Sequence, residues 1–306
     1  MNKLKTTFLG VEFKNPIVTS SGCFGFGTEF KDYCDPNILG GMTLKGITLE
    51  PRTGNLGTRI AETPSGILNC VGLENPGIDY FEKEIIPNLK KENITSNIIV
   101  NINGSTLEDY IELAKRVNEI EEIQFVELNI SCPNVKNGGM AFGANPEMAG
   151  KITREVKKVL TKKKMIVKLS PNVTNIVEIA KIVEENGADA ISLINTLLGM
   201  RIDINTGKPI LGNIMGGLSG PAVKPVAVRM VYQVAQNVKI PIIGMGGIAS
   251  YEDAIEFIMA GATLVSLGTA LFPNPILPKE VKEGLEKYVE DKKLNNIQDI
   301  RGCAFL

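Results

Sequence analysis

Histidine is absent from this 306-residue sequence. Histidine is the most common general base of enzymes and a frequent ligand of transition metals. Its absence excludes every Ser-His-Asp or Cys-His mechanism within the chain. Any general base must therefore be a Cys, Asp, Glu, Lys or Tyr side chain.

An excess of charge of one sign is also missing. The chain has 33 Lys+Arg against 34 Asp+Glu, which gives a formal net charge of -1. Because nucleic acids and anionic membranes attract basic surfaces, we expect neither as a partner. No segment approaches the roughly 18 uninterrupted apolar residues of a membrane-spanning helix. Glu12 and Lys14 interrupt the first apolar stretch before the core of a signal peptide can form.

The sequence has few cysteines, and their spacing shows no closely spaced pair. The five cysteines, at positions 23, 34, 70, 132 and 303, include no Cys-x-x-Cys pair. This spacing fits neither a disulfide framework nor a zinc or iron-sulfur site, so we expect no bound metal in this chain. Together with the missing membrane segments, it predicts a soluble cytoplasmic protein.

Short apolar runs rich in Val and Ile recur along the whole chain, and each is followed by a polar or glycine-containing turn and a helical pattern. The runs cover residues 16–21, 42–47, 97–102, 125–130, 165–170, 189–195, 240–245 and 263–268. The clearest amphipathic helical patterns cover residues 106–120, 145–160, 174–186 and 251–260. Several of these open on Thr, Asn or Ser, which are good helix caps.

Eight strand-helix units predict an α/β fold, a closed (β/α)8 or TIM barrel, in preference to an open doubly wound sheet. Residues 187–195 and 261–269 resemble each other over nine positions, as equivalent units of a barrel should. No linker divides the chain, so we expect residues 1–306 to form a single domain. Connections near 48–76, 131–145 and 196–220 are longer than usual and are expected to carry function.

Glycines and hydroxyl groups follow the last two predicted strands, in GMGGI (244–248) and SLGTA (266–270). This is the usual phosphate site of such barrels, where backbone N–H groups hold the anion. The alternative is that the glycines serve tight turns only. No strand-associated G-x-G-x-x-G is present, so a mononucleotide cofactor or a phosphorylated substrate is favoured over a dinucleotide.

The other residues expected at the mouth of the barrel are mostly amides and cations, with almost no carboxylate, which disfavours a glycosidase pair or a divalent metal cage. Lys45 and Lys168 end the second and fifth strands, where they would reach solvent or, as we favour, counter an anion. Cys132 leads the loop after the fourth strand. Chemistry alone leaves two interpretations of Cys132 open, a thiolate base or a loop cysteine beside a proline turn. The other four cysteines are expected to be small apolar residues.

Nine motifs, in order, make the chain resemble a class 1 dihydroorotate dehydrogenase from about residue 4 to 300. They are SSGCFGFG (20–27), TLKGIT (43–48), NCVGL (69–73) with ENPG (74–77), NISCPNVKNGG (129–139), VKLSPN (167–172), LINTLLGMRID (193–203), GGLSGPA (216–222), GMGGI and LGTA. The resemblance implies a barrel that contains FMN and oxidises dihydroorotate to orotate in pyrimidine synthesis. It also implies that Cys132 is the base that takes the C5 proton while the C6 hydride passes to the flavin.

The resemblance further assigns binding roles by position. The residues matched to the substrate are Lys45, Asn69, Cys70, Val71, Gly72, Leu73, Asn129, Asn195 and Thr196. Those matched to FMN are Ser21, Lys45, Gly46, Asn101, Asn129, Lys168, Ile194, Gly220, Gly246, Gly247, Gly268 and Thr269. The planar amides among them suit a pyrimidine ring, and Lys168 suits the negative charge of reduced flavin.

The loop VKNGGMAFG (135–143) resembles class 1B rather than class 1A. Class 1B implies an α2β2 heterotetramer around a core homodimer of this chain. The partner would be an iron-sulfur subunit that carries FAD and a 2Fe-2S cluster and passes electrons to NAD. Three alternatives remain: a fumarate-dependent class 1A-like homodimer, another FMN barrel such as a dihydropyrimidine or dihydrouridine reductase-like enzyme, and a non-redox phosphate-binding barrel.

Overall fold

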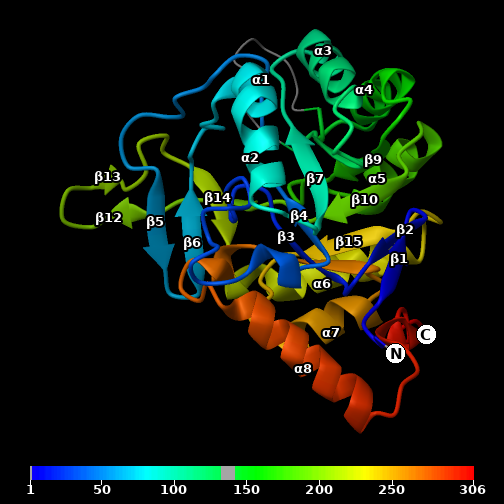
Figure 1. Cartoon of the computed structure of the whole chain (residues 1–306). Helices are drawn as coiled ribbons and strands as arrows, with labels where there is room; N and C mark the ends of the chain where they lie inside the picture. Colours follow the sequence, from blue (N-terminus) through cyan, green and yellow to red (C-terminus); the bar gives the residue numbers. More distant parts are fainter. Residues whose placement is uncertain (1, 132–141) are drawn as a thin grey trace.

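The computed structural model describes residues 2–131 and 142–306. At its centre lies a closed barrel of parallel strands (Figure 1), in which the first and last strands also pair. All eight strands overlap the predicted apolar runs, so the predicted (β/α)8 barrel is confirmed. In chain order they are β3 (Ile17–Thr19), β4 (Gly41–Thr43), β7 (Asn97–Ile102), β8 (Phe125–Asn129), β9 (Lys164–Lys168), β10 (Ala190–Leu193), β15 (Ile242–Met245) and β16 (Leu264–Leu267).

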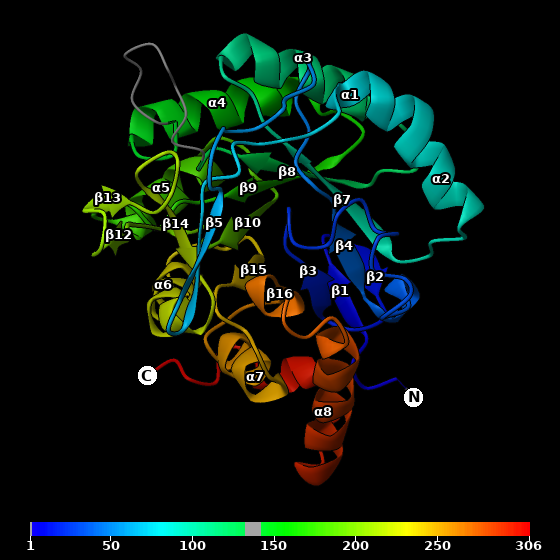
Figure 2. The same cartoon turned by 90° about the vertical axis from the view of Figure 1, so that its left-hand side faces the viewer.

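Helices surround the barrel (Figure 2) and pack their apolar faces against the outward side chains of the strands. They are α1 (Gly77–Tyr80), continued through a π turn (Phe81–Ile85) into α2 (Ile86–Lys91), then α3 (Leu107–Asn118), α4 (Pro146–Val159), α5 (Ile176–Glu185), α6 (Lys224–Ala235), α7 (Tyr251–Met259) and α8 (Leu277–Asp291). The four predicted helices are confirmed as α3, α4, α5 and α7. Their N-terminal caps are side chains of the predicted types, Thr106, Asn145, Asn175 and Ser250.

The connection from β3 to β4 differs from the prediction of a helix after every strand. Within residues 20–40, the only helical element described is the short 3-10 helix η1 (Pro36–Ile38). Gly22, Gly25 and Gly27 all have positive φ angles, which an α-helix does not accommodate. The segment is instead held by the stacked rings of Phe24 and Phe30, whose centroids are 4.8 Å apart.

Two of the long connections fold together beside the barrel, which the sequence patterns do not predict. They form an antiparallel sheet in the order β11–β14–β6–β5, here called the accessory sheet. Its strands are β5 (Ile60–Thr63), β6 (Gly66–Asn69), β11 (Leu197–Gly199) and β14 (Gly216–Ser219). A small hairpin, β12 (Ile202–Asp203) with β13 (Lys208–Pro209), projects from this side of the molecule (Figure 1).

The predicted internal similarity is also present in the structure. Gly187 and Gly261, with φ angles of 99° and 111°, end the turns after α5 and α7. In both turns the next residue donates its backbone N–H to a carbonyl five residues earlier. These turns lead into β10 and β16, so the similar segments are equivalent units of the barrel.

An N-terminal hairpin closes the bottom of the barrel. It consists of β1 (Thr6–Phe8) and β2 (Val11–Phe13), and Phe8 and Phe13 are fully buried against Phe125, with ring centroids 5.5 to 6.0 Å apart. Gly41 makes room for this floor, because a Cβ at that position would lie 2.8 Å from the Phe13 ring. No helix in the described ranges is both long and apolar enough to cross a bilayer.

Replacement of Phe13 by Ala should destabilise the protein by about 3–5 kcal/mol, because it removes a fully buried ring and leaves a cavity in the floor. Thr7→Ala, at an exposed position of the same hairpin, is the control and should change stability by less than about 0.5 kcal/mol. Denaturant unfolding of the two variants measures both values. A loss below about 1 kcal/mol for Phe13→Ala would show that the hairpin does not support the barrel.

Candidate active site

The inward side chains of the barrel change from apolar to polar along each strand. Val18, Ile99, Phe125, Ile166, Ala190 and Leu264 form one buried cluster with the N-terminal hairpin. Side chains alternate between the two faces of a strand, so the residues two positions later also point inward. These are Ser20, Asn101, Glu127, Lys168, Ser192 and Ser266. The C-terminal end of the barrel is therefore polar, above an apolar floor.

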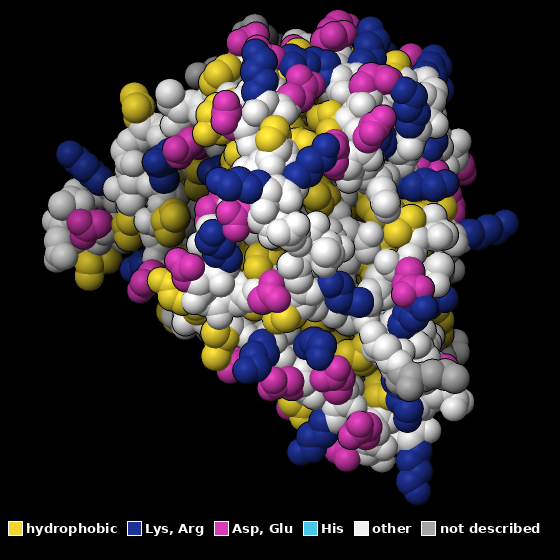
Figure 3. Space-filling view, in the orientation of Figure 1, with side chains coloured by type: hydrophobic (Ala, Val, Ile, Leu, Met, Phe, Trp, Pro, Cys, Tyr) yellow, Lys and Arg dark blue, Asp and Glu magenta, His cyan; other side chains and the backbone are white. Residues whose placement is uncertain are grey.

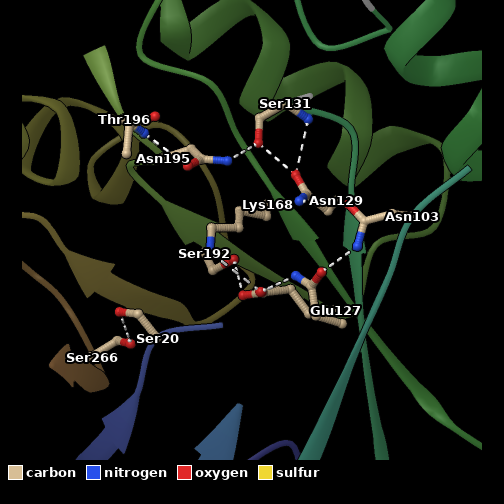
Figure 4. Close-up of polar contacts among 11 residues, drawn as sticks. Ser20, Asn103, Glu127, Asn129, Ser131, Lys168, Ser192, Asn195, Thr196 and Ser266 are labelled. Carbon is tan, nitrogen blue, oxygen red and sulfur yellow. Dashed lines mark hydrogen bonds and ion pairs between the residues drawn. The ribbon is translucent and has the colours of Figure 1, made fainter. Parts of the chain in front are cut away.

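Glu127 lies at the centre of this polar layer and is almost fully buried (Figure 4). One carboxylate oxygen accepts a hydrogen bond from Asn101 Nδ2 at 2.6 Å and lies 3.5 Å from Lys168 Nζ. The other oxygen accepts from Ser192 Oγ at 2.7 Å. Glu127 therefore gathers donors from β7, β9 and β10 and neutralises the buried lysine.

A chain of hydrogen bonds leads from Asn101 to the rim of the barrel (Figure 4). Asn103 Nδ2 donates to Asn101 Oδ1 at 2.7 Å, and Asn129 Nδ2 donates to Asn103 Oδ1 at 2.8 Å. Ser131 Oγ donates to Asn129 Oδ1 at 2.6 Å and accepts from Asn195 Nδ2. The structure thus joins Asn101, Asn129 and Asn195, three of the predicted site residues.

The accessory sheet brings two more predicted residues to this rim. Asn69 pairs with Gly217 across β6 and β14, and its Nδ2 donates to the Gly217 carbonyl at 3.3 Å. A Cβ at Gly217 would overlap the Thr196 hydroxyl, so only glycine lets these strands approach. The Thr196 backbone N–H donates to Asn195 Oδ1 at 2.8 Å. Residues 69 and 196, far apart in sequence, therefore lie side by side.

The glycines predicted to hold a phosphate converge on the opposite side of the mouth. Gly246 and Gly247 have φ angles of 125° and 80°, and a Cβ at Gly247 would lie 2.8 Å from the Gly220 carbonyl and 2.9 Å from the Lys224 backbone nitrogen. A Cβ at Gly246 would lie 3.2 Å from Ile194. Ile194, Gly220, Gly246 and Gly247 thus form one close-packed cradle.

Hydroxyl groups complete this cradle. Thr269 Oγ1 and Ser219 Oγ are 2.8 Å apart, and Ser20 Oγ and Ser266 Oγ are 2.7 Å apart. A Cβ at Gly268 would lie 3.2 Å from Ser20 Oγ and 3.6 Å from Cys23 Sγ. Burial raises the pKa of the Cys23 thiol to about 11, although the Lys168 charge opposes this shift. Cys23 is therefore a neutral thiol at the edge of the cradle.

Lys45 and Gly46 follow β4, the second strand of the barrel. A Cβ at Gly46 would overlap the Asn103 amide nitrogen and lie 2.7 Å from Asn101 Oδ1. Lys45 is half-buried, and its ammonium has no hydrogen-bond partner among the residues that the structure describes. Ser21, two residues after the end of β3, is half-buried. A role for Lys45 in binding a ligand remains a prediction.

The remaining predicted residues follow β6 or lie outside the described residues. Gly72 and Leu73 have positive φ angles of 81° and 58°. The Cys70 thiol turns away from the polar mouth into a small apolar cluster, 3.6 Å from the Thr58 carbonyl, and the Val71 carbonyl accepts from the backbone of Asn55. Cys132, the predicted base, lies outside the described residues. Roles for these side chains in binding remain predictions.

Glu127, Ser192, Ser219 and Ser266 are polar residues of the mouth to which the sequence analysis did not assign a binding role, although Ser219 and Ser266 lie within the quoted motifs GGLSGPA and SLGTA. Glu127 had a usable signal, because it is the only charged residue in the apolar run FVELNI and lies two positions before Asn129. Ser192 and Ser266 occupy the matching positions of the two similar segments. No group of three His, Cys, Asp or Glu side chains suited to a metal occurs in the part of the chain that the structure describes.

Comparisons with known proteins agree with the resemblance seen in the motifs. A family model described as dihydroorotate dehydrogenase matches residues 3–289. Three similar proteins carry the name dihydroorotate dehydrogenase B (NAD(+)), catalytic subunit. The protein from Brachyspira hyodysenteriae is 61% identical over 306 residues and all of both chains. The protein from Alkaliphilus metalliredigens is 55% identical over 299 residues and 98% of both chains.

The third, from Anoxybacillus flavithermus, is 52% identical over 305 residues, which cover 100% of this chain and 97% of the relative. The match therefore extends over the barrel, the accessory sheet and the polar mouth together. The chain belongs to the dihydroorotate dehydrogenase family.

Proposed function

We propose that this chain is the catalytic subunit of a class 1B dihydroorotate dehydrogenase, which oxidises dihydroorotate to orotate in pyrimidine synthesis. The observation that carries the proposal is the mouth of the barrel, where hydrogen bonds and strand pairing bring Asn69, Asn129, Asn195 and Thr196 together with a glycine cradle on the opposite side. Planar amides match the donors and acceptors of a pyrimidinedione ring. Lys45 supplies a positive charge for the substrate carboxylate.

The glycine cradle and the polar layer fit FMN. Gly220, Gly246 and Gly247 let backbone segments pack closely, because a Cβ there would lie 2.6 to 2.8 Å from neighbouring protein atoms. We propose that backbone N–H groups of these glycines hold the phosphate. Thr269 and Ser219 add hydroxyl groups beside it. Lys168, held in the barrel by Glu127, would face the ring system. FMN, when bound, supplies the hydride acceptor that no protein side chain provides.

The chain's own residues then position the substrate and move one proton. Oxidation of dihydroorotate removes a proton from C5 and a hydride from C6, which leaves the C5–C6 double bond of orotate. We propose that the Cys132 thiolate takes the C5 proton, on the resemblance of NISCPN (129–134) to the family motif. The asparagines hold the ring, and Lys168 balances the negative charge that forms on the cofactor side.

The electrons leave through a second protein. The relatives are named as NAD(+) enzymes and as catalytic subunits, which implies another subunit for those proteins. We propose for this chain an iron-sulfur partner that carries FAD and a 2Fe-2S cluster and delivers the electrons to NAD, in an α2β2 heterotetramer. The described cysteines are free thiols, as in the reducing cytoplasm, where we place the enzyme.

Residues 1–306 are proposed to form one domain that pairs with a second copy through the accessory-sheet side. Apolar side chains lie exposed on this sheet, its loops and the β12–β13 hairpin, and Figure 3 shows hydrophobic groups on this side of the molecule. Exposed apolar patches of this kind mark protein interfaces. The residues are Leu56, Ile60, Leu198, Met200, Ile202, Ile204, Ile214 and Met215, here called the apolar face.

The purified protein should be yellow, and anaerobic addition of dihydroorotate should bleach its visible flavin band, because the substrate hydride reduces the bound FMN. Absorbance spectra before and after addition measure this reduction. A yellow protein whose band does not bleach would contradict the proposed substrate, and a colourless protein would favour a non-redox barrel. Turnover with fumarate and no second subunit would favour the class 1A alternative.

Replacement of Cys132 by Ala should leave FMN bound and slow its reduction by dihydroorotate about 100- to 10,000-fold, as expected for the loss of a positioned base. Anaerobic stopped-flow absorbance measures the rate. Cys303→Ala, at an exposed position near the C-terminus, is the control and should leave the rate unchanged. Near-normal reduction in the Cys132 variant would remove this residue from the mechanism.

The double variant L198D/I202D should convert the core dimer into monomers, because it places two charges on the apolar face. Sedimentation velocity of the purified catalytic subunit measures the change. Y33D, which alters an exposed apolar residue outside this face, is the control and should remain dimeric. If the double variant is folded and still dimeric, the second copy binds elsewhere.

A further inference from the structure

The hydrogen bonds of the barrel mouth form one chain whose direction is fixed at both ends. At one end stands the Thr196 backbone N–H, which can only donate. At the other end stands Glu127, whose ionised carboxylate can only accept. Between them every link donates in the same sense, from Asn195 through Ser131, Asn129, Asn103 and Asn101.

An asparagine amide inserted in such a chain has only one workable orientation. If the amide of Asn101 were reversed, its carbonyl oxygen would face the Glu127 carboxylate, and two acceptors would meet without a proton between them. The reversal would also present its NH2 group to the NH2 group of Asn103. The same reasoning passes from Asn103 to Asn129, whose Oδ1 also accepts from the Ser131 backbone N–H at 3.2 Å. The carboxylate and the backbone N–H groups of Ser131 and Thr196 therefore require the same orientation of every amide.

Glu127 also fixes the buried cation. Lys168 is 6% exposed at its side chain and Glu127 is 1% exposed, and their charged atoms are 3.5 Å apart. A lysine ammonium has three donors, and this contact engages one of them, which leaves the others for a ligand. A buried cation without a counterion would strongly destabilise the folded protein. One carboxylate therefore both orients the amides and retains the lysine.

We propose that Glu127 is a positioning residue, which acts together with the Ser131 and Thr196 backbone N–H groups to orient the Asn129 and Asn195 amides toward the pyrimidine, and which holds Lys168 toward the flavin. The proposal rests on the proposed function, since it concerns the same substrate and cofactor. Glu127 acts through its neighbours, because Asn101 and Lys168 stand between it and the ligands assigned to the mouth. Its two effects are separable, because the amide chain and the ion pair meet only at the carboxylate.

Three variants of the holoenzyme separate these effects. Glu127→Gln keeps the shape but removes the charge, and it offers Asn101 either an acceptor or a donor. Asn103→Leu breaks the chain between Asn101 and Asn129 and leaves the Glu127–Lys168 pair intact. Ser96→Ala is the matched control, because Ser96 is also a buried, hydrogen-bonded serine but donates to the Pro36 and Leu39 carbonyls, at the opposite end of β7 from Asn101.

Two measurements apply to each variant: the dissociation constant of orotate, from the change in flavin absorbance, and the midpoint potential of the bound FMN. Asn103→Leu should weaken orotate binding at least tenfold and leave the potential unchanged. Glu127→Gln should weaken orotate binding at least fivefold and make the potential more positive, because the Lys168 charge is no longer neutralised. Ser96→Ala should change orotate affinity less than twofold and leave the potential unchanged.

The proposal is overturned if Asn103→Leu and Glu127→Gln bind orotate within twofold of the parent protein. It is equally overturned if Ser96→Ala loses as much affinity as the other two, because the loss would then follow from the removal of any buried hydrogen bond. If Glu127→Gln fails to fold, the orotate affinity of Asn103→Leu alone tests whether the chain orients the amides. Failure of the parent protein itself to bind orotate or to be reduced by dihydroorotate would instead refute the proposed function.

Discussion

The buried carboxylate of Glu127 is the interaction on which the polar mouth depends. A charge in this position requires several donors, and the closed barrel supplies them from three different strands. The same closure places an apolar floor beneath the charge, sealed by Phe8 and Phe13 of the N-terminal hairpin. Because Glu127 and Lys168 are shielded from water, an unpaired donor or acceptor beside them would be costly, so the hydrogen bonds keep their directions.

The accessory sheet extends the mouth beyond the barrel. Its strands come from connections that are distant in sequence, and Gly217 lets Asn69 reach the position of Thr196. The chain of amides inside the barrel ends at this Thr196 backbone, so the sheet and the barrel form one continuous rim. The apolar face lies on the outside of the same region. The proposed contact between two copies would therefore involve the same sheet that carries part of the proposed substrate site.

Much of this arrangement could be predicted from residues alone. The eight apolar runs and the caps at Thr106 and Ser250 determine strands and helices locally, so the barrel follows from period and spacing. The motifs place Asn129, Lys168 and the glycines of the cradle at strand ends.

The accessory sheet could not be predicted, because short strands such as Gly216–Ser219 become strands only through pairing with a distant partner. The role of Glu127 could not be predicted, because it depends on contacts with Asn101, Lys168 and Ser192, which lie on other strands.

The orientation of the amides is the central claim, and neutron diffraction from deuterium-exchanged crystals of the holoenzyme tests it most directly. The deuterons on Nδ2 of Asn101, Asn103 and Asn129 should each point along the chain toward Glu127, and the carboxylate should carry no deuteron. A deuteron on Glu127, or an amide turned the other way, would contradict the account.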